Sequence, residues 1–342
     1  MWLKYLVQHL SEFERAAQFL KQGKLVAFPT ETVYGLGADA SNPEGVRRIF
    51  ALKGRPANHP LIVHLQGVDE LVHWARDIPF SVERLTSRFW PGPLTLVLKR
   101  ATGVIDEVTG GQDTVGLRVP SHPVAQQLLQ AFGGGIAAPS ANRFGRVSPT
   151  TAQHVREDLG DAVDLILDGG ACEVGIESTI LDLSSGAPVL LRPGRIGAAE
   201  IETVIGAQVA RASAQSPRAP GMLEAHYAPQ LPLLLAAATD LDRMVREQAA
   251  VGPVAVLARH ARPRDSRSAL WQIAAHDAEA YAHHLYALLR FLDRSGCAVI
   301  VVEAPPERPE WDAVRDRLTR AAAASGANPA RASAKTRAAG AA

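Results

Sequence analysis

Lys53 and Arg55 are separated only by Gly54, and this spacing could bring two cations of different shape to one polyphosphate. A lysine ammonium is a compact charge, whereas an arginine guanidinium can donate two parallel hydrogen bonds to phosphate oxygens. Lys53 also falls at the end of a predicted helix, where the helix dipole favours a cation in any protein. The pair therefore indicates either a phosphate site or an ordinary helix terminus.

A further arginine, Arg118, lies inside the apolar segment 116–120. A buried guanidinium destabilises a protein unless an anion accompanies it. That anion is either an internal carboxylate or the carboxylate of a substrate, and the polar motifs elsewhere in the chain favour the substrate. His64 ends another apolar run, and a lone histidine in such a place is more often a satisfied core residue than a catalyst.

Hydroxyl, amide and carboxylate groups follow several other predicted strands. They occur in 29–37 (PTETVYGLG), 139–142 (PSAN), 177–179 (EST) and 192–194 (RPG), and at Ser148. Two glycines in the first of these motifs let a backbone approach a ligand closely. Each motif alone is also typical of turns and caps. Together with the cations, they predict a polar cavity that binds anions.

Several well-known signatures are missing from the sequence. It contains no GxxxxGK[ST] phosphate loop, no complete GxGxxG fingerprint, no HExxH zinc motif and no GxSxG nucleophile motif. An ATP site would therefore be built in another way. Cys172 and Cys297 form no CxxC pair, which argues against a structural zinc site or a disulfide framework.

The composition is that of a soluble globular protein with a substantial core, since 47% of the residues are hydrophobic and 21% are charged. A formal net charge of +1 argues against a mainly electrostatic nucleic-acid binder, which needs a strong basic excess. Residues 1–10 do not resemble a signal peptide, and no apolar run is long enough to span a bilayer. These observations predict a cytoplasmic protein.

The elements that position the motifs can be predicted from periodicity and capping residues. Ser11 and Glu14 form a capping box at the start of one helix, and Asn42 and Pro43 suit the start of a second. A third helix is predicted at 123–132. Strands are predicted at 25–28, 61–65, 94–98, 115–119, 165–167, 179–183 and 189–191. Because their spacing is not uniform, these elements predict a mixed α/β domain rather than a doubly wound one.

The composition changes after residue 206, which predicts a domain boundary. Residues 1–206 are predicted to form the first domain, and the proline-containing stretch 207–231, which has few core-like runs, a linker. A second domain, 232–324, is predicted to hold a small parallel sheet. Its strand-like runs are 233–236, 254–258 and 299–302, and its helix-like segments are 278–292 and 311–323. Residues 325–342 lack large apolar side chains and are predicted to be disordered.

Taken in order, the motifs resemble those of one family. FPTETVYGLG at 28–37, KGR at 53–55, PLIVH at 60–64, GLRVP at 116–120, PSAN at 139–142, ESTI at 177–180 and RPG at 192–194 strongly resemble the YrdC-like domain of threonylcarbamoyl-AMP synthases. Residues 219–222 and 226–229 resemble the linker of the family's long, two-domain form, and 231–324 resembles its C-terminal domain. The resemblance implies a twisted mixed α/β sheet around a large cavity, a small Rossmann-like α/β C-terminal domain, and a linker that closes over the active site.

The resemblance also implies a reaction. L-threonine, bicarbonate and ATP would give threonylcarbamoyl-AMP, pyrophosphate and water, with Mg²⁺ bound mainly through ATP and no organic cofactor. A downstream complex would then transfer the threonylcarbamoyl group to an adenosine of certain tRNAs. The implied partners are the three substrates and that complex, with at most a weak contact to tRNA and none to a membrane.

Carried over position by position, the resemblance assigns Lys53 and Arg55 to catalysis and to ATP binding. The other positions implied to bind ATP are His59, Thr114, Ser140, Asn142, Ser148, Arg192 and Tyr227. Those implied to bind threonine are Thr32, His64, Arg118, Ala138 and Ser178. Two departures from the family pattern are His59, where many relatives have asparagine, and 223–225, where relatives often have a basic residue.

Two other interpretations remain open. A carbamoyltransferase of hydrogenase maturation also uses a YrdC-like domain, but it carries cysteine-rich zinc motifs that two isolated cysteines cannot supply. An RNA-binding module could use the same cations for phosphate groups. The near-zero net charge and the lack of an aromatic–basic stripe disfavour that module.

Overall fold

The computed structural model describes residues 11–325, which form two compact units. The first unit extends to Met222, except that Gly145–Val147 belong to the second unit together with the residues from Leu223 onward. The predicted linker 207–231 is therefore divided between the units, and its closing over the active site stays a prediction. Residues 325–342 were predicted to be disordered. Of these, all except Ser325 lie outside the described part of the chain.

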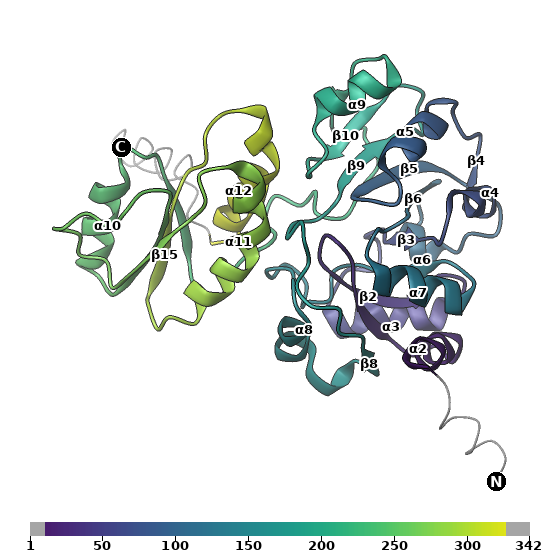
Figure 1. Ribbon diagram of the computed structural model, residues 1–342, viewed down its shortest axis with the longest axis horizontal. Coiled ribbons are helices and arrows are strands. Elements are labelled where there is room, and N and C mark those ends of the chain that lie inside the picture. The colour runs from purple at the N-terminus through teal and green to yellow at the C-terminus, as the bar shows by residue number, and fades with distance from the viewer. Residues whose placement is uncertain (1–10, 326–342) are drawn as a thin grey trace, which may run out of the picture. The chain divides into compact units, whose positions relative to one another are not determined.

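Within the described residues, the first unit is built on one mixed sheet of eleven strands (Figure 1). Their order is β11-β10-β9-β5-β6-β3-β7-β2-β1-β8, and β4 pairs with β5 beside this path. β3 is parallel to β6 and β5 to β9, whereas β2 is antiparallel to β1 and β7. The strands are β1 Val26–Pro29, β2 Tyr34–Asp39, β3 Ile62–His64, β4 Ala75–Arg76, β5 Leu94–Arg100, β6 Thr114–Arg118, β7 Ile136–Ala137, β8 Leu165–Ile166, β9 Thr179–Asp182, β10 Val189–Arg192 and β11 Ala210–Arg211. The predicted mixed α/β sheet is confirmed.

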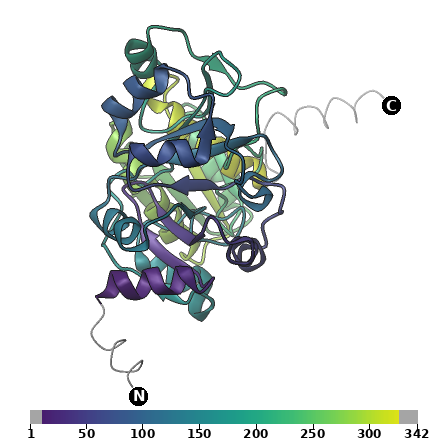
Figure 2. The ribbon, with the colours of Figure 1, turned by 90° about the vertical axis from the view of Figure 1, so that its right-hand side faces the viewer.

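The three helices predicted in this unit form as expected. Ser11 and Glu14 make the reciprocal capping box of α2, Asn42 caps α3, and Gly133 ends α7 in the left-handed conformation. Figure 2 shows α2, in purple, along the lower edge of the first unit. The helices are α2 Glu12–Lys21, α3 Pro43–Lys53, α4 Leu71–Trp74, α5 Ser81–Phe89, α6 Asp106–Thr109, α7 Pro123–Phe132, α8 Ala152–Leu159 and α9 Ala198–Ile205, with 3₁₀ turns η1 Val68–Glu70 and η2 Gly160–Ala162.

Strand β2 was not predicted, because its glycines and the polar residues before it suggested a loop. Thr30 closes a tight turn by donating from its hydroxyl to the carbonyl oxygen of Val33 at 2.7 Å, and β2 then returns antiparallel to β1. Gly37 suits this strand because a Cβ atom there would lie 2.9 Å from side-chain atoms of Phe28 and Ile136. The polar residues 30–32 thus form the hairpin loop between two buried strands.

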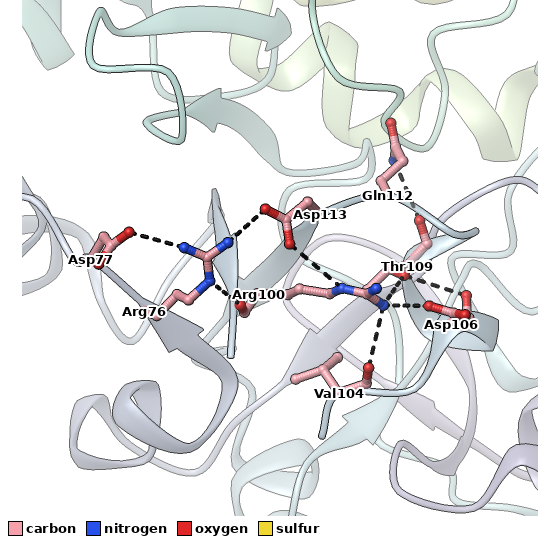
Figure 3. A network of polar contacts seen from close by, with 8 residues as sticks. All are labelled: Arg76, Asp77, Arg100, Val104, Asp106, Thr109, Gln112 and Asp113. Carbon is pink, nitrogen blue, oxygen red and sulfur yellow. Dashed lines mark hydrogen bonds and ion pairs between the residues drawn. The ribbon is translucent and has the colours of Figure 1, made fainter. Parts of the chain in front are cut away.

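A network of ion pairs connects exposed and half-buried residues around β4, β5 and the start of β6 (Figure 3). Arg76 contacts Asp113 at 2.6 Å and Asp77 at 3.0 Å, and Arg100 contacts Asp106 and, at 3.8 Å, Asp113. The network borders a surface depression of about 630 Å³. This depression contains none of the predicted site residues, so the network serves the sheet edge rather than the predicted chemistry.

The second unit contains a four-stranded sheet in the order β12-β15-β13-β14, with all strands parallel. Its elements are β12 Leu233–Ala236, α10 Leu241–Ala249, β13 Val254–Ala258, β14 Leu270–Ile273, α11 Ala278–Asp293, β15 Val299–Glu303, η3 Pro309–Trp311 and α12 Asp312–Ala324. In Figure 1, α10 lies on one side of this sheet and α11 and α12 on the other. The predicted small parallel sheet is confirmed, with β14 as an additional strand.

No helix in residues 11–325 combines the length and apolarity that crossing a membrane requires.

Candidate active site

The predicted site residues of the first unit include four cations that are almost completely buried. Lys53, Arg55, Arg118 and Arg192 are 4%, 8%, 3% and 3% exposed, respectively. Burying an unpaired charge is strongly unfavourable, so each of these cations must have polar partners. Those partners show which of the predicted residues come together.

Lys53, the last residue of α3, reaches the segment that follows β7. Its Nζ donates a hydrogen bond of 2.6 Å to the carbonyl oxygen of Ser140 and a second to that of Asn142. Burial, and then the charge of Arg55, hold the pKa of Lys53 well below its ordinary value. The structure therefore joins the predicted Lys53 with the predicted pair Ser140 and Asn142. The interpretation of Lys53 as only a helix-end cation does not account for these contacts.

Arg55 and His59 share one aromatic neighbour, Phe144. The guanidinium carbon of Arg55 lies 5.6 Å from the centre of the Phe144 ring, and the His59 ring meets the same ring edge-on at 5.5 Å. Arg55 Nη2 also donates to the carbonyl oxygen of Pro60 at 2.9 Å. Burial, followed by the charges of Arg55 and Arg218, lowers the pKa of His59. His59 is therefore neutral at neutral pH and can contribute hydrogen bonds but no charge.

Thr114 begins β6, at the opposite end of that strand from Arg118. It lines a small cavity together with Pro60 and Pro220. Arg192 Nη1 donates to the carbonyl oxygen of Pro220 at 3.0 Å. Thr114 therefore lies near the two segments whose carbonyl groups hold Arg55 and Arg192.

Arg118 ends β6, and three residues from two other segments hold its guanidinium. Nη2 lies 2.6 Å from Glu31 Oε1, Nη1 donates to Thr32 Oγ1 at 2.9 Å, and Nε donates to the carbonyl oxygen of Gly92 at 3.2 Å. The preference for a substrate carboxylate as the compensating anion was thus wrong, because Glu31 supplies that charge from within the fold. The predicted contact of Arg118 with threonine is a separate matter and stays a prediction.

His64 ends β3 and pairs in register with Arg118 on β6. Its side chain is buried, and its Nδ1 has no hydrogen-bond partner among the described residues. Burial, and then the charge of Arg118, lower the pKa of His64 to about 3. His64 is therefore a neutral imidazole at pH 7, and its role in threonine binding stays a prediction. Beside it, the backbone N–H of Ala138 donates to the carbonyl oxygen of Ile62 at 2.9 Å, which ties the start of the Ser140 segment to β3.

Arg192 and Ser178 meet where β10 ends and β9 begins. Arg192 Nε donates to the Ser178 carbonyl oxygen and Nη2 to the Ser178 hydroxyl, each at 3.0 Å. The Ser178 hydroxyl also shares a hydrogen bond of 2.8 Å with Thr95. Close by in sequence, Glu177 accepts a hydrogen bond of 2.5 Å from Ser148, which is completely buried. The motifs 148, 177–179 and 192–194 are thus brought together as predicted.

Gly194 permits this arrangement because the RPG turn packs directly on the start of β9. A Cβ atom at position 194 would lie 2.3 Å from the backbone nitrogen of Thr179 and 2.7 Å from the carbonyl carbon of Ser178. Those distances are far below van der Waals contact, and the obstructing atoms are backbone. Only glycine allows the turn to hold Arg192 against Ser178.

Known protein families match both parts of the chain. The Sua5/YciO/YrdC family model, described as telomere recombination, matches residues 18–194, and a model described as the C-terminal domain of threonylcarbamoyl-AMP synthase matches residues 196–323. The threonylcarbamoyl-AMP synthase of Pyrococcus abyssi is 42% identical over 90% of this chain and 92% of that protein. The chain belongs to the threonylcarbamoyl-AMP synthase family. The enzyme of that name from Bacillus subtilis is 38% identical over 91% of this chain and 93% of its own length.

A solved structure of a family member has the same fold. The complex of Pyrococcus abyssi Sua5 with L-threonine superposes with a TM-score of 0.84 and 40% identity, over 92% of this chain and 94% of that one. The predicted fold of a threonylcarbamoyl-AMP synthase, a large twisted mixed sheet with a second α/β domain, is therefore confirmed.

One residue that the family resemblance assigns to ATP, Tyr227, belongs to the second unit. It is buried, its backbone has a φ of 60°, and its ring stacks on Tyr286 at 6.0 Å. The guanidinium carbon of Arg317 lies 5.1 Å from the centre of the Tyr227 ring. A positive φ is uncommon outside glycine, so this conformation is held by the surrounding structure. The predicted role of Tyr227 in covering the nucleotide stays a prediction.

Four residues that build the site of this threonylcarbamoyl-AMP synthase family member were not predicted from its sequence. Glu31, Thr95, Phe144 and Glu177 each contact a predicted site residue, but none was assigned a role. Glu31 and Glu177 had a usable signal, because each stands directly before a predicted threonine-binding residue inside a motif. Phe144 and Thr95 had none, because only the folded chain brings them next to Arg55 and Ser178.

Proposed function

We propose that this chain is an L-threonylcarbamoyladenylate synthase, which converts L-threonine, bicarbonate and ATP to threonylcarbamoyl-AMP, pyrophosphate and water. The observation that carries the proposal is that β3 lies between two strands of the site: it pairs with β6, which ends at Arg118, and with β7, which leads into the Ser140 segment that Lys53 contacts. Two buried groups of polar residues thus lie on neighbouring strands. One group, around Lys53 and Arg55, suits phosphates, and the other, around Arg118, suits an amino-acid carboxylate. Relatives named threonylcarbamoyl-AMP synthase over nearly the whole chain support this assignment, as does the threonine complex of the Pyrococcus abyssi relative.

The chemistry requires positioning and charge stabilisation rather than a covalent enzyme intermediate. The neutral threonine amine adds to carbon dioxide with loss of a proton, or to bicarbonate with loss of water, and gives a carbamate. A carbamate oxygen then attacks the α-phosphate of ATP in line while pyrophosphate leaves. Lys53, Arg55 and Arg192 would stabilise the negative charge on the phosphates. Their existing hydrogen bonds to backbone carbonyls hold them in place before the substrate arrives, which reduces the reorganisation that the reaction needs.

We propose that Mg²⁺ would enter with ATP and supply positive charge to its phosphates. In residues 11–325, no three His, Cys, Asp or Glu side chains gather to hold a metal ion. The buried cations Lys53, Arg55 and Arg192 instead suit the phosphate oxygens of ATP. Mg²⁺ would neutralise charge that develops on the leaving pyrophosphate.

At the threonine end of the proposed site, Arg118 would receive the substrate carboxylate. Thr32, Ser178 and the backbone near Ala138 would complete that pocket. His64 is neutral at pH 7, so it can accept a hydrogen bond from threonine without repelling the substrate ammonium. Carbamates hydrolyse readily, so a linker segment that excludes water during the reaction would protect the intermediate.

The proposed product is an activated acyl donor, and its consumer would be a complex that modifies tRNA. The match of residues 196–323 to the synthase C-terminal domain favours this reaction over the carbamoyltransferase of hydrogenase maturation. It also disfavours a pure RNA-binding module, for which the net charge of +1 provides no support.

Pyrophosphate release tests the proposal directly. Purified full-length protein is incubated with ATP and Mg²⁺, with threonine and bicarbonate added together and each omitted in turn. Release that requires both, accompanied by threonylcarbamoyl-AMP in the mass spectrum, is the expected result. Absence of release from folded protein in every mixture would contradict the proposed reaction.

A further inference from the structure

A buried carboxylate that is absent from the predicted site residues, Glu31, contacts the arginine predicted to bind the substrate carboxylate. We infer that Glu31 is a positioning residue that fixes the orientation of the Arg118 guanidinium and thereby sets the affinity of the pocket for threonine. This inference rests on the proposed function, because it concerns the threonine subsite of that reaction. Glu31 and Arg118 are each 3% exposed, so their orientations are determined by their protein neighbours.

The contacts of Arg118 leave donors available for a ligand. Glu31, Thr32 and the carbonyl of Gly92 each engage one nitrogen of the guanidinium. Each terminal nitrogen of an arginine carries a second N–H, which these contacts do not use. A carboxylate binds such a pair of donors in parallel, which requires the guanidinium plane to be fixed. Among the three contacts, only the one with Glu31 brings a full opposite charge.

Glu31 is itself held in place. Its Oε2 accepts a hydrogen bond of 3.1 Å from the backbone N–H of Ser121, which follows β6. On the other side, the Thr30 hydroxyl closes the hairpin turn that carries Glu31 by bonding to Val33 at 2.7 Å. The carboxylate therefore links the 30–33 turn to the end of β6, and these two segments carry Thr32 and Arg118.

A direct contact between Glu31 and the substrate ammonium is the competing explanation. Both carboxylate oxygens already have partners, since Oε1 faces Arg118 and Oε2 faces Ser121. An ammonium group would have to displace one of these contacts or share an oxygen with it. The geometry therefore favours action through Arg118.

The substitution Glu31→Gln separates the two explanations in the full-length protein. Glutamine has nearly the same shape and can still accept from the Ser121 N–H, but it removes the negative charge from beside Arg118. Calorimetric titration measures the affinity for L-threonine, for 2,3-dihydroxybutanoate, which has a hydroxyl in place of the amine, and for ATP. We expect both carboxylate ligands to weaken by the same factor, roughly 10- to 100-fold, with ATP binding unchanged.

Three results would overturn the inference. A loss confined to threonine would indicate a direct contact with the ammonium group, an unchanged affinity for threonine would exclude positioning, and an equal loss for ATP would indicate a general structural defect. If wild-type protein bound no threonine, the proposed function would fail first, and the inference with it. The wild-type titration thus distinguishes failure of the function from failure of the Glu31 assignment.

Glu303→Gln is the matched control, because Glu303 forms an ion pair with Arg259 in the second unit, where the Glu303 side chain is 5% and the Arg259 side chain 20% exposed. The substitution makes the same chemical change to an arginine–glutamate pair outside the candidate site, and we expect this variant to bind threonine with wild-type affinity.

Glu31→Asp covers the case in which Glu31→Gln does not fold, because it keeps the charge and loses one methylene. We expect the Asp variant to bind threonine more weakly than wild type but to bind ATP equally well. Wild-type threonine affinity in that variant would also overturn the inference.

Discussion

Arg192 donates two hydrogen bonds of 3.0 Å to Ser178, one to its carbonyl oxygen and one to its hydroxyl. The family resemblance assigns Arg192 to ATP and Ser178 to threonine. One guanidinium therefore connects the two halves of the candidate site. The packing of Gly194 on the start of β9 keeps these residues in contact.

A substitution of Arg192 should consequently affect both substrates. Lysine keeps the charge but cannot donate to two acceptors in a fixed plane, so Arg192→Lys should weaken ATP and threonine by roughly tenfold each. Calorimetric titration of each substrate provides the measurement. Arg88→Lys is a suitable control, since the Arg88 side chain is 64% exposed. A loss limited to ATP would show that the contact with Ser178 has no influence on threonine.

Arg118→Lys should affect threonine more than ATP. A lysine at this position cannot satisfy Glu31, Thr32 and Gly92 at once and still bind a carboxylate in parallel. We expect the Kd for threonine to rise about tenfold or more, while the Kd for ATP stays within error. Equal losses for the two substrates, measured under the same buffer conditions, would contradict the assignment of Arg118 to threonine.

The lowered pKa of Lys53 predicts a pH dependence of ATP binding. Lys53 carries its charge below its folded pKa and loses it as the pH rises through that value, which burial and Arg55 place well below the ordinary value for lysine. ATP affinity should therefore fall as the pH rises, and should do so at a lower pH than an ordinary lysine would cause. In Lys53→Arg this alkaline loss should disappear, because arginine stays protonated. An identical pH profile in both proteins would show that another group is responsible.

The pKa of His64 predicts that acid destabilises the first unit. The folded pKa is about 3, below the ordinary value of 6.5, so between these values the unfolded state binds a proton that the folded state does not. The free energy of unfolding should therefore fall as the pH drops through this window, by up to about 1.4 kcal/mol per pH unit. Urea unfolding at pH 7 and at pH 5 should show a smaller difference for His64→Asn than for wild type. Equal differences would rule out His64 as the source.

The exposed ion-pair network should contribute little to stability. Asp113 contacts both Arg76 and Arg100, yet its side chain is 68% exposed, and water screens such pairs. Asp113→Asn should lower the free energy of unfolding by about 1 kcal/mol or less, and the difference should shrink in 1 M salt, where screening is much stronger. Wild-type enzymatic activity is expected, because the depression that this network borders is lined by no predicted site residue. A large loss that salt does not reduce would mean that Asp113 acts through something other than its charge.

The sequence predicted best those features that depend on neighbouring residues. The capping box of Ser11 and Glu14, the start of α3 at Asn42 and the end of α7 at Gly133 all follow local rules, and all are confirmed. Strand β2 was missed because Gly35 and Gly37 look like loop residues locally. Their lack of side chains is needed only because other parts of the sheet pack against them.

The candidate site shows the same contrast between features that follow from local sequence and features that depend on the folded chain. The cations and hydroxyls could be found as motifs, and the structure brings Lys53 to Ser140 and Arg192 to Ser178. The anion that compensates Arg118 could not be identified, because choosing Glu31 requires knowing that the 30–33 turn folds back onto the end of β6. The ring of Phe144 under Arg55 is likewise a product of the tertiary structure alone.

Gly194 limits which amino acids can occupy position 194 of this family member. Since a Cβ atom there would overlap the backbone of β9, every other amino acid should be eliminated from a library randomised at this position and selected for activity. Gly197, three residues later, has open space around its Cβ position, and the same library design should accept many residues there. Two glycines three residues apart should therefore differ completely in the replacements that they tolerate.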